Sequence, residues 1–129
     1  MTEQEQEQVQ HIRANAALVV ETMQPLTDFE FGYTDQSVKW LDGFIERTRM
    51  HHPTEDEIDR QTSNLGSYLG EAIIAAYGGA WEHDDHGWHI RWSEKNRAYP
   101  FFKVAKHVRY GAENSIYSFY SAIRALPKG

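Results

Sequence analysis

The residues best suited to chemistry in this chain are three histidines spaced three apart, His83, His86 and His89, with Asp84 and Asp85 between the first two. Imidazole nitrogens and carboxylate oxygens are ligands that zinc, nickel and copper accept. The same residue types are typical of a solvent-exposed turn, because aspartate favours turns and histidine tolerates unusual backbone angles. The sequence therefore predicts a polar turn first, with a loose metal site as the alternative.

Glu71 is a second candidate, because it directly follows Gly70 on the small-residue face of a predicted helix. A partly buried carboxyl group can act as a general acid or base. The alternative is a structural pairing with Lys103, with Arg109 or with the N-terminus of the last helix. We therefore treat Glu71 as a candidate buried acid that the structure must place.

Other catalytic signatures are missing from the sequence. None of the serines lies in a Gly-x-Ser-x-Gly elbow, and no glycine-rich loop precedes a helix as a phosphate-binding loop does. The chain has no cysteine, which excludes disulfides, thiolate catalysis and cysteine-ligated metal centres. The sequence favours a protein without catalytic activity and without a cofactor. A metal-dependent or carboxylate-dependent enzyme is the alternative.

Charge is distributed unevenly along the chain, whose formal net charge is −6. Residues 1–94 carry a balance of −12 and residues 95–129 a balance of +6. We expect the two regions to neutralise each other in the fold. The alternative is a basic strip that binds an anion or nucleic acid, formed by Lys103, Lys106, His107 and Arg109. Because the chain is acidic and has no nucleic-acid-binding motif, we do not expect nucleic acid as a partner.

The length and composition indicate one domain over residues 1–129, of which 1–8 form a frayed helix start or a disordered tail. The chain is 40% hydrophobic and 25% charged, which is typical of a soluble globular protein. No apolar run approaches the roughly 20 residues of a membrane span, and the acidic N-terminus is not a secretory signal. We therefore expect a cytoplasmic protein without a membrane partner.

Apolar residues at spacings of three and four predict helices over residues 9–23, from about 35 to 50, and 55–77. Thr54 and Glu57 form a capping box at the start of the third helix. Gly66 and Gly70 lie on one face of that helix, where each costs about 1 kcal/mol relative to alanine. We expect a backbone or a ring to approach the helix closely at these two glycines.

A hairpin is predicted next, with strands near 80–83 and 88–92 around the turn 84–87. Residues 99–108 are predicted to form a third strand, at an edge because of Pro100. A last helix begins at Asn114 or Ser115. The predicted fold class is α+β, with three N-terminal helices, a three-stranded antiparallel sheet and a C-terminal helix.

Several runs of the chain resemble a known family. They are Ser37–Glu46, Leu65–Glu71, Tyr77–Trp81, Tyr99–Val104 and Gly111–Tyr120. In this order they resemble the bacterial family called domain of unknown function 3806, over about residues 29–124. The resemblance implies a single-domain α+β fold and brings no established reaction, cofactor or catalytic residue.

The aromatic residues of the predicted sheet point to a function in binding. If one face of the sheet lacks a covering helix, Trp92 and Tyr99 form an exposed patch of the kind that marks partner surfaces. We therefore expect a non-catalytic protein-binding module. One version is an immunity or antitoxin-like protein whose acidic surface covers a basic toxin. A small-molecule binder with a pocket between the sheet and the Gly66/Gly70 helix is an alternative, and the oligomeric state is left open.

Overall fold

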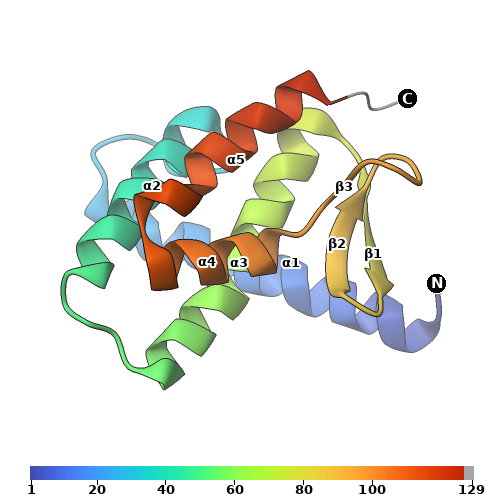
Figure 1. The fold of residues 1–129 in the computed structure, drawn as a ribbon, viewed down its shortest axis with the longest axis horizontal. Helices are drawn as coiled ribbons and strands as arrows, with labels where there is room; N and C mark the ends of the chain where they lie inside the picture. The colour runs from blue at the N-terminus through green and yellow to red at the C-terminus, as the bar shows by residue number, and fades with distance from the viewer. Residues whose placement is uncertain (127–129) are drawn as a thin grey trace.

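The computed structural model describes residues 1–126 and confirms the α+β class (Figure 1). Three helices precede an antiparallel sheet of strand order β1-β2-β3, and two helices follow it. The helices and strands are α1 (Glu3–Met23), α2 (Asp35–Arg49), α3 (Glu55–Tyr77), β1 (Ala80–Asp84), β2 (Gly87–Arg91), β3 (Arg97–Ala98), α4 (Pro100–Tyr110) and α5 (Ile116–Ala122). Short 3-10 helices span Gln24–Leu26, Ala112–Asn114 and Ile123–Ala125.

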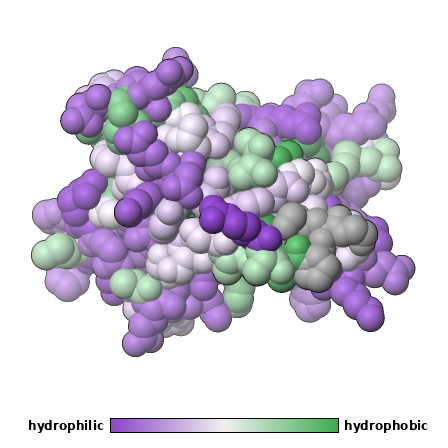
Figure 2. Space-filling view, turned by 90° about the horizontal axis from the view of Figure 1, so that it is seen from above, coloured by the Kyte–Doolittle hydropathy of each residue, from purple (hydrophilic) through white to green (hydrophobic). Residues whose placement is uncertain are grey.

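Helix α3 is the central element, with α1 packed along one side and α4 along another (Figure 1). Helices α2 and α5 pack against each other, and the sheet lies beside the N-terminal part of α1. Seen from above, hydrophilic residues surround paler ones, and hydrophobic residues occur in small groups (Figure 2). None of the helices over residues 1–126 is long and apolar enough to cross a membrane.

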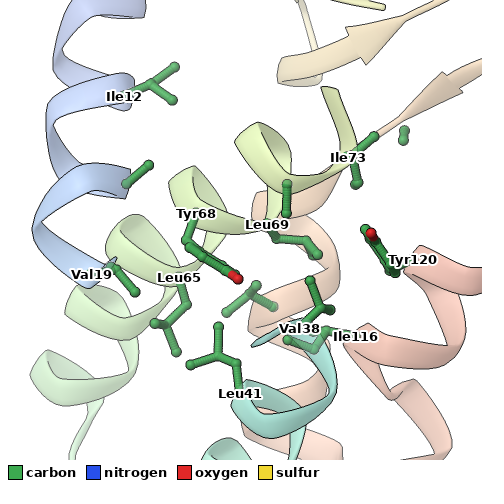
Figure 3. Packing of buried hydrophobic residues seen from close by; sticks show 14 of the residues in the cluster. Ile12, Val19, Val38, Leu41, Leu65, Tyr68, Leu69, Ile73, Ile116 and Tyr120 are labelled. Atoms are coloured by element: carbon green, nitrogen blue, oxygen red, sulfur yellow. The ribbon is translucent and has the colours of Figure 1, made fainter. Parts of the chain in front are cut away.

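The core is built around two large side chains of α3, Tyr68 and Leu69, both fully buried. Residues from α1, α2, α3 and α5 converge on them, as Figure 3 shows. The Tyr68 hydroxyl donates a hydrogen bond to the carbonyl of Gly32, so the one polar atom of this ring is satisfied. Burial raises the pKa of Tyr68, which stays protonated as a donor.

The predicted strand over residues 99–108 is wrong. Only Arg97 and Ala98 pair as β3, and α4 begins at Pro100. Proline suits the first helical position, because it has no N–H to leave unpaired there and its backbone angle is already helical. Val104, His107 and Val108 are buried at spacings of three and four, and Gly111 ends the helix at a φ of 96°. The chain therefore has five α-helices over its described residues where four were predicted.

Helix α1 begins at Glu3, ahead of the predicted start at Val9. Its first turn is closed by a capping box in which the Thr2 side chain accepts from the Glu5 N–H and the Glu5 carboxylate accepts from the Thr2 N–H. Gln8 also accepts a hydrogen bond from the indole of Trp88. Residues expected to fray or to be disordered are thus helical and reach the sheet.

The two glycines of α3 are contacted by rings, as predicted. A Cβ at Gly66 would overlap the Phe101 ring of α4, and a Cβ at Gly70 would overlap the indole of Trp81 on β1. The two rings also contact each other, with centroids 5.8 Å apart. These rings fill the space in which a pocket between the sheet and α3 was expected.

We predict that Gly66→Ala and Gly70→Ala each lower the free energy of unfolding by about 1–3 kcal/mol, because the added methyl group must displace a packed ring. Gly43→Ala in α2 is the matched control, since its Cβ would meet only the flexible end of Arg47. There the gain in helix propensity should dominate and raise stability by up to about 1 kcal/mol. Urea unfolding measures all three, and equal effects would contradict the ring contacts.

Candidate functional site

The hairpin separates the residues that the sequence grouped together. Glu82 pairs with His89 across the strands, and His83 pairs with Trp88. Because side chains alternate along a strand, His89 projects from one face of the sheet and His83 from the other. The third histidine, His86, lies in the turn.

Each of the three histidines has different surroundings. His83 is exposed and lies against the Trp88 ring at 5.2 Å, whereas His86 meets the Tyr99 ring edge-on at 6.5 Å. His89 is fully buried, with its ring 4.9 Å from that of Tyr99. Within residues 1–126, no group of three or more histidine, aspartate or glutamate side chains is arranged to hold a metal ion.

Asp84 joins the hairpin to the start of α4. Its carboxylate accepts hydrogen bonds from the backbone N–H of His86 at 2.7 Å, from the Tyr99 hydroxyl at 3.1 Å and from Arg97 at 3.2 Å. Burial pushes the pKa of Asp84 upward. The hydrogen bonds from His86 and Tyr99, together with the charges of His89 and His86, outweigh burial and hold it below its usual value. The ionised carboxylate therefore holds the hairpin turn against the start of α4.

His89 is the buried neighbour of Asp84. Its Nδ1 lies 3.1 Å from the Gly87 carbonyl and 3.6 Å from Asp84, and its Nε2 lies 3.7 Å from Glu82. Nδ1 donates to the carbonyl, and Nε2 has no hydrogen-bond partner among the described residues. Because the ring has no exposed surface, it has no route to a substrate in this conformation.

We predict that Asp84→Asn lowers the free energy of unfolding at pH 7 and that this difference shrinks under acid. A carboxylate whose folded pKa lies below its unfolded value near 3.9 adds stability that is present above about pH 5. That stability is lost as the pH falls through the folded pKa. Urea unfolding of wild type and variant at several pH values between about 7 and 3 measures the difference.

Asp85→Asn is the control for this prediction, because Asp85 is the exposed neighbour in the same turn. We expect it to leave the pH dependence of stability close to that of the wild type. If the difference in the free energy of unfolding between wild type and Asp84→Asn stays constant from neutral to acidic pH, the charge of Asp84 does not stabilise the turn.

Glu71 takes part in an internal pairing. Its carboxylate accepts a hydrogen bond from the Trp81 indole at 2.9 Å and lies 3.8 Å from Arg13, and its side chain is 18% exposed. The expected partners Lys103 and Arg109 are not the ones that it contacts. The indole that packs on Gly70 is thus also held at its nitrogen.

The acidic and basic regions of the chain meet in the fold. Arg97 contacts Asp84, and Arg109 binds Glu55 through two hydrogen bonds of 3.0 and 2.9 Å. His107 is fully buried, with its Nε2 2.8 Å from Glu46 of α2.

The Nδ1 of His107 accepts a hydrogen bond from the backbone N–H of Ile116, so the proton lies on Nε2 and is donated to Glu46. His107 thereby connects α4 to α2 and to the start of α5. The predicted basic strip therefore loses His107 to the interior, and Arg109 is paired with Glu55. Lys103 and Lys106 are its two lysines, and each lies over an aromatic ring.

Trp92 and Tyr99 lie on opposite faces of the sheet. Trp92 follows Ile90 on the face packed against α3 and donates its indole N–H to the Tyr77 carbonyl at 3.1 Å. Tyr99 packs on His89 on the other face. Both side chains are half-buried, so they do not form one patch.

A different set of side chains lines the outer face of α4. Phe102, Lys106 and Tyr110 recur at a spacing of four, which places them on one face of the helix, and Tyr99 at its N-cap lines the same hollow as Phe102. These four residues are here called the α4 stripe. Phe102 is 63% exposed and Tyr110 is 66% exposed. The Lys106 ammonium lies 4.9 Å from the centre of the Phe102 ring. Large aromatic side chains are thus held in solvent on both sides of a cation.

The surface is hollowed at each end of the α4 stripe. At the N-terminal end, a cavity of about 390 Å³ is lined by His86, Tyr99 and Phe102. At the other end, a cavity of about 440 Å³ lies between Tyr110 and the loop at His52 and Pro53.

Sequence reasoning missed the exposed position of Phe102, because it treated residues 99–108 as a strand, and it did not consider Tyr110, which follows that segment. The helical spacing of Val104, His107 and Val108 was the signal that could have found them.

Comparison of the chain with protein-family models, with curated proteins and with solved structures finds no match. The resemblance to domain of unknown function 3806 therefore stays a prediction. The arguments about function rest on the geometry of this molecule.

Proposed function

We propose that this protein is a binding module for another protein and that the α4 stripe is its contact surface. The observation that carries the proposal is the pair of exposed aromatic side chains, Phe102 and Tyr110, on one helix face with Lys106 between them. Aromatic side chains are enriched at protein–protein interfaces, and tyrosine is among the residues that most often dominate interface energetics.

The stripe is supported by a rigid base, which favours binding. Phe101 packs on α3 at Gly66, and Val104 and His107 are fully buried. The helix therefore presents Phe102 and Tyr110 at a fixed spacing of eight residues, which is about 12 Å along the axis. A surface that is already ordered loses less conformational entropy when it binds.

The charge around the stripe favours an acidic partner segment. Lys103 and Lys106 lie over the rings of Phe119 and Phe102, so both cations are presented beside apolar surface. An extended or helical segment with acidic residues around an apolar anchor would complement this arrangement. The immunity-like version instead requires a basic partner on an acidic surface, such as the start of α3 with Glu55, Asp56 and Glu57.

A photo-crosslinking amino acid placed at position 102 tests the proposal in the cells that make the protein. We expect one discrete adduct at position 102 and the same adduct at position 110. Leu26 is the matched control, because it is 59% exposed and lies in the 3-10 helix after α1. Equal labelling at positions 26 and 102 would contradict a specific surface on α4.

The crosslinked protein, once identified and purified, allows a quantitative test. Phe102→Ala and Tyr110→Ala should each weaken its binding by about tenfold or more, since residues that dominate an interface contribute about 2 kcal/mol. Lys106→Glu should also weaken it, whereas Leu26→Ala should leave the dissociation constant unchanged. Calorimetry measures these four variants together with Asp56→Lys. Binding that survives the α4 substitutions but is lost in Asp56→Lys would support the immunity-like version instead.

A further inference from the structure

The two fully buried histidines, His107 and His89, have opposite hydrogen-bonding surroundings. The Nδ1 of His107 faces a donor, the backbone N–H of Ile116 at 3.2 Å, and its Nε2 faces an acceptor, the Glu46 carboxylate at 2.8 Å. A single proton on the ring therefore satisfies both nitrogens. His107 needs no positive charge to complete its hydrogen bonds.

Only acceptors lie near the ring nitrogens of His89. Its Nδ1 is 3.1 Å from the Gly87 carbonyl oxygen and 3.6 Å from the Asp84 carboxylate. Its Nε2 is 3.7 Å from the Glu82 carboxylate and has no hydrogen-bond partner among the described residues. A neutral ring that donates from Nδ1 leaves a bare Nε2 facing that carboxylate. A ring with two protons can donate from both nitrogens.

The other groups around His89 divide into those that favour a charged ring and those that oppose it. The titratable or charged groups that face it are Glu82 and Asp84 of β1, His86 of the turn, Arg91 of β2, Arg97 of β3 and Tyr99 at the start of α4. Lys103 and Lys106 of α4 lie over other rings, and α3 packs on the opposite face of the sheet.

The two arginines each bind one of the two carboxylates, Arg91 at Glu82 and Arg97 at Asp84, and they oppose a further positive charge. The Tyr99 ring favours it, because its centre is 4.9 Å from that of His89 and aromatic faces attract cations within about 6 Å. A proton on His89 is therefore held by direct contacts of the ring and not by the net charge of this face.

From these contacts we infer that His89 is a proton-binding site, at which an imidazolium ring joins β2 to Glu82 and Asp84 of β1. Imidazole is the side chain that ordinarily changes charge between pH 5 and 8. The folded hairpin holds this proton more tightly than the unfolded chain does. The stability that it adds is therefore present in mildly acidic solution and is lost as the pH rises. This pH-sensitive link does not depend on the proposed protein partner.

Nitrogen-15 labelling of the histidine rings tests the inference in the wild-type protein. At about pH 6 we expect the ring nitrogens of His89 to show protons on both positions. The ring of His107 should show one proton, on Nε2, at the same pH. His89→Gln identifies the signals. A His89 ring that carries a single proton at this pH would overturn the inference.

Glu82→Gln provides a second test, because it keeps the side-chain length and removes the charge that faces Nε2. We expect it to lower the equilibrium constant for folding about two- to tenfold more at pH 6 than at pH 8, since only a charged His89 loses an ionic partner. The contact of Glu82 with Arg91 is lost equally at both pH values, because both groups stay charged there.

Glu46→Gln is the matched control for Glu82→Gln. Glu46 also contacts an arginine, Arg49, and a buried histidine, but that histidine is neutral in its hydrogen bonds. The effect of Glu46→Gln should therefore be the same at pH 6 and pH 8. Both variants keep all seven histidines of the chain, so the titration of the unfolded state cancels in the comparison. Urea unfolding measures both, and an effect of Glu82→Gln that is equal or smaller at pH 6 would contradict a proton on His89.

Discussion

The contact on which the rest of the structure depends is the approach of two rings to the backbone of α3. Phe101 sits on Gly66 and Trp81 sits on Gly70, and neither ring would fit against an alanine. One ring belongs to α4 and the other to β1, so this single face of α3 fixes both the helix and the sheet. With Phe101 turned inward, the next residue, Phe102, is turned outward at the surface.

The residues that the sequence marks as candidates for catalysis or metal binding mostly connect helices and strands to one another. Asp84 joins the hairpin to the start of α4, and Glu71 holds the indole that packs on α3. His107 links α4 to Glu46 of α2 and to the start of α5. Each replaces hydration by hydrogen bonds inside the fold, which polar groups need when they are buried.

Helix α3 therefore separates two surfaces of different character. Leu65 lines the cavity shared with α1, whereas its neighbour Gly66 supports α4. The α4 stripe exposes aromatic rings next to lysines, which suits a macromolecular partner. The hollow between α1 and α3 is open to solvent, and polar and charged side chains line its edge.

The sequence by itself determined the elements whose signals are local. Thr54, Glu57 and the Gly78 stop predicted α3, and alternation predicted the faces of the hairpin. It also predicted that the glycines of α3 are approached closely, because their cost in a helix needs a compensating contact. Only the tertiary structure decided which rings meet them and that residues 100–110 form a helix. The aromatic and β-branched residues of this segment favour a strand by propensity, and burial of one helical face against α3 and α2 overrides that preference.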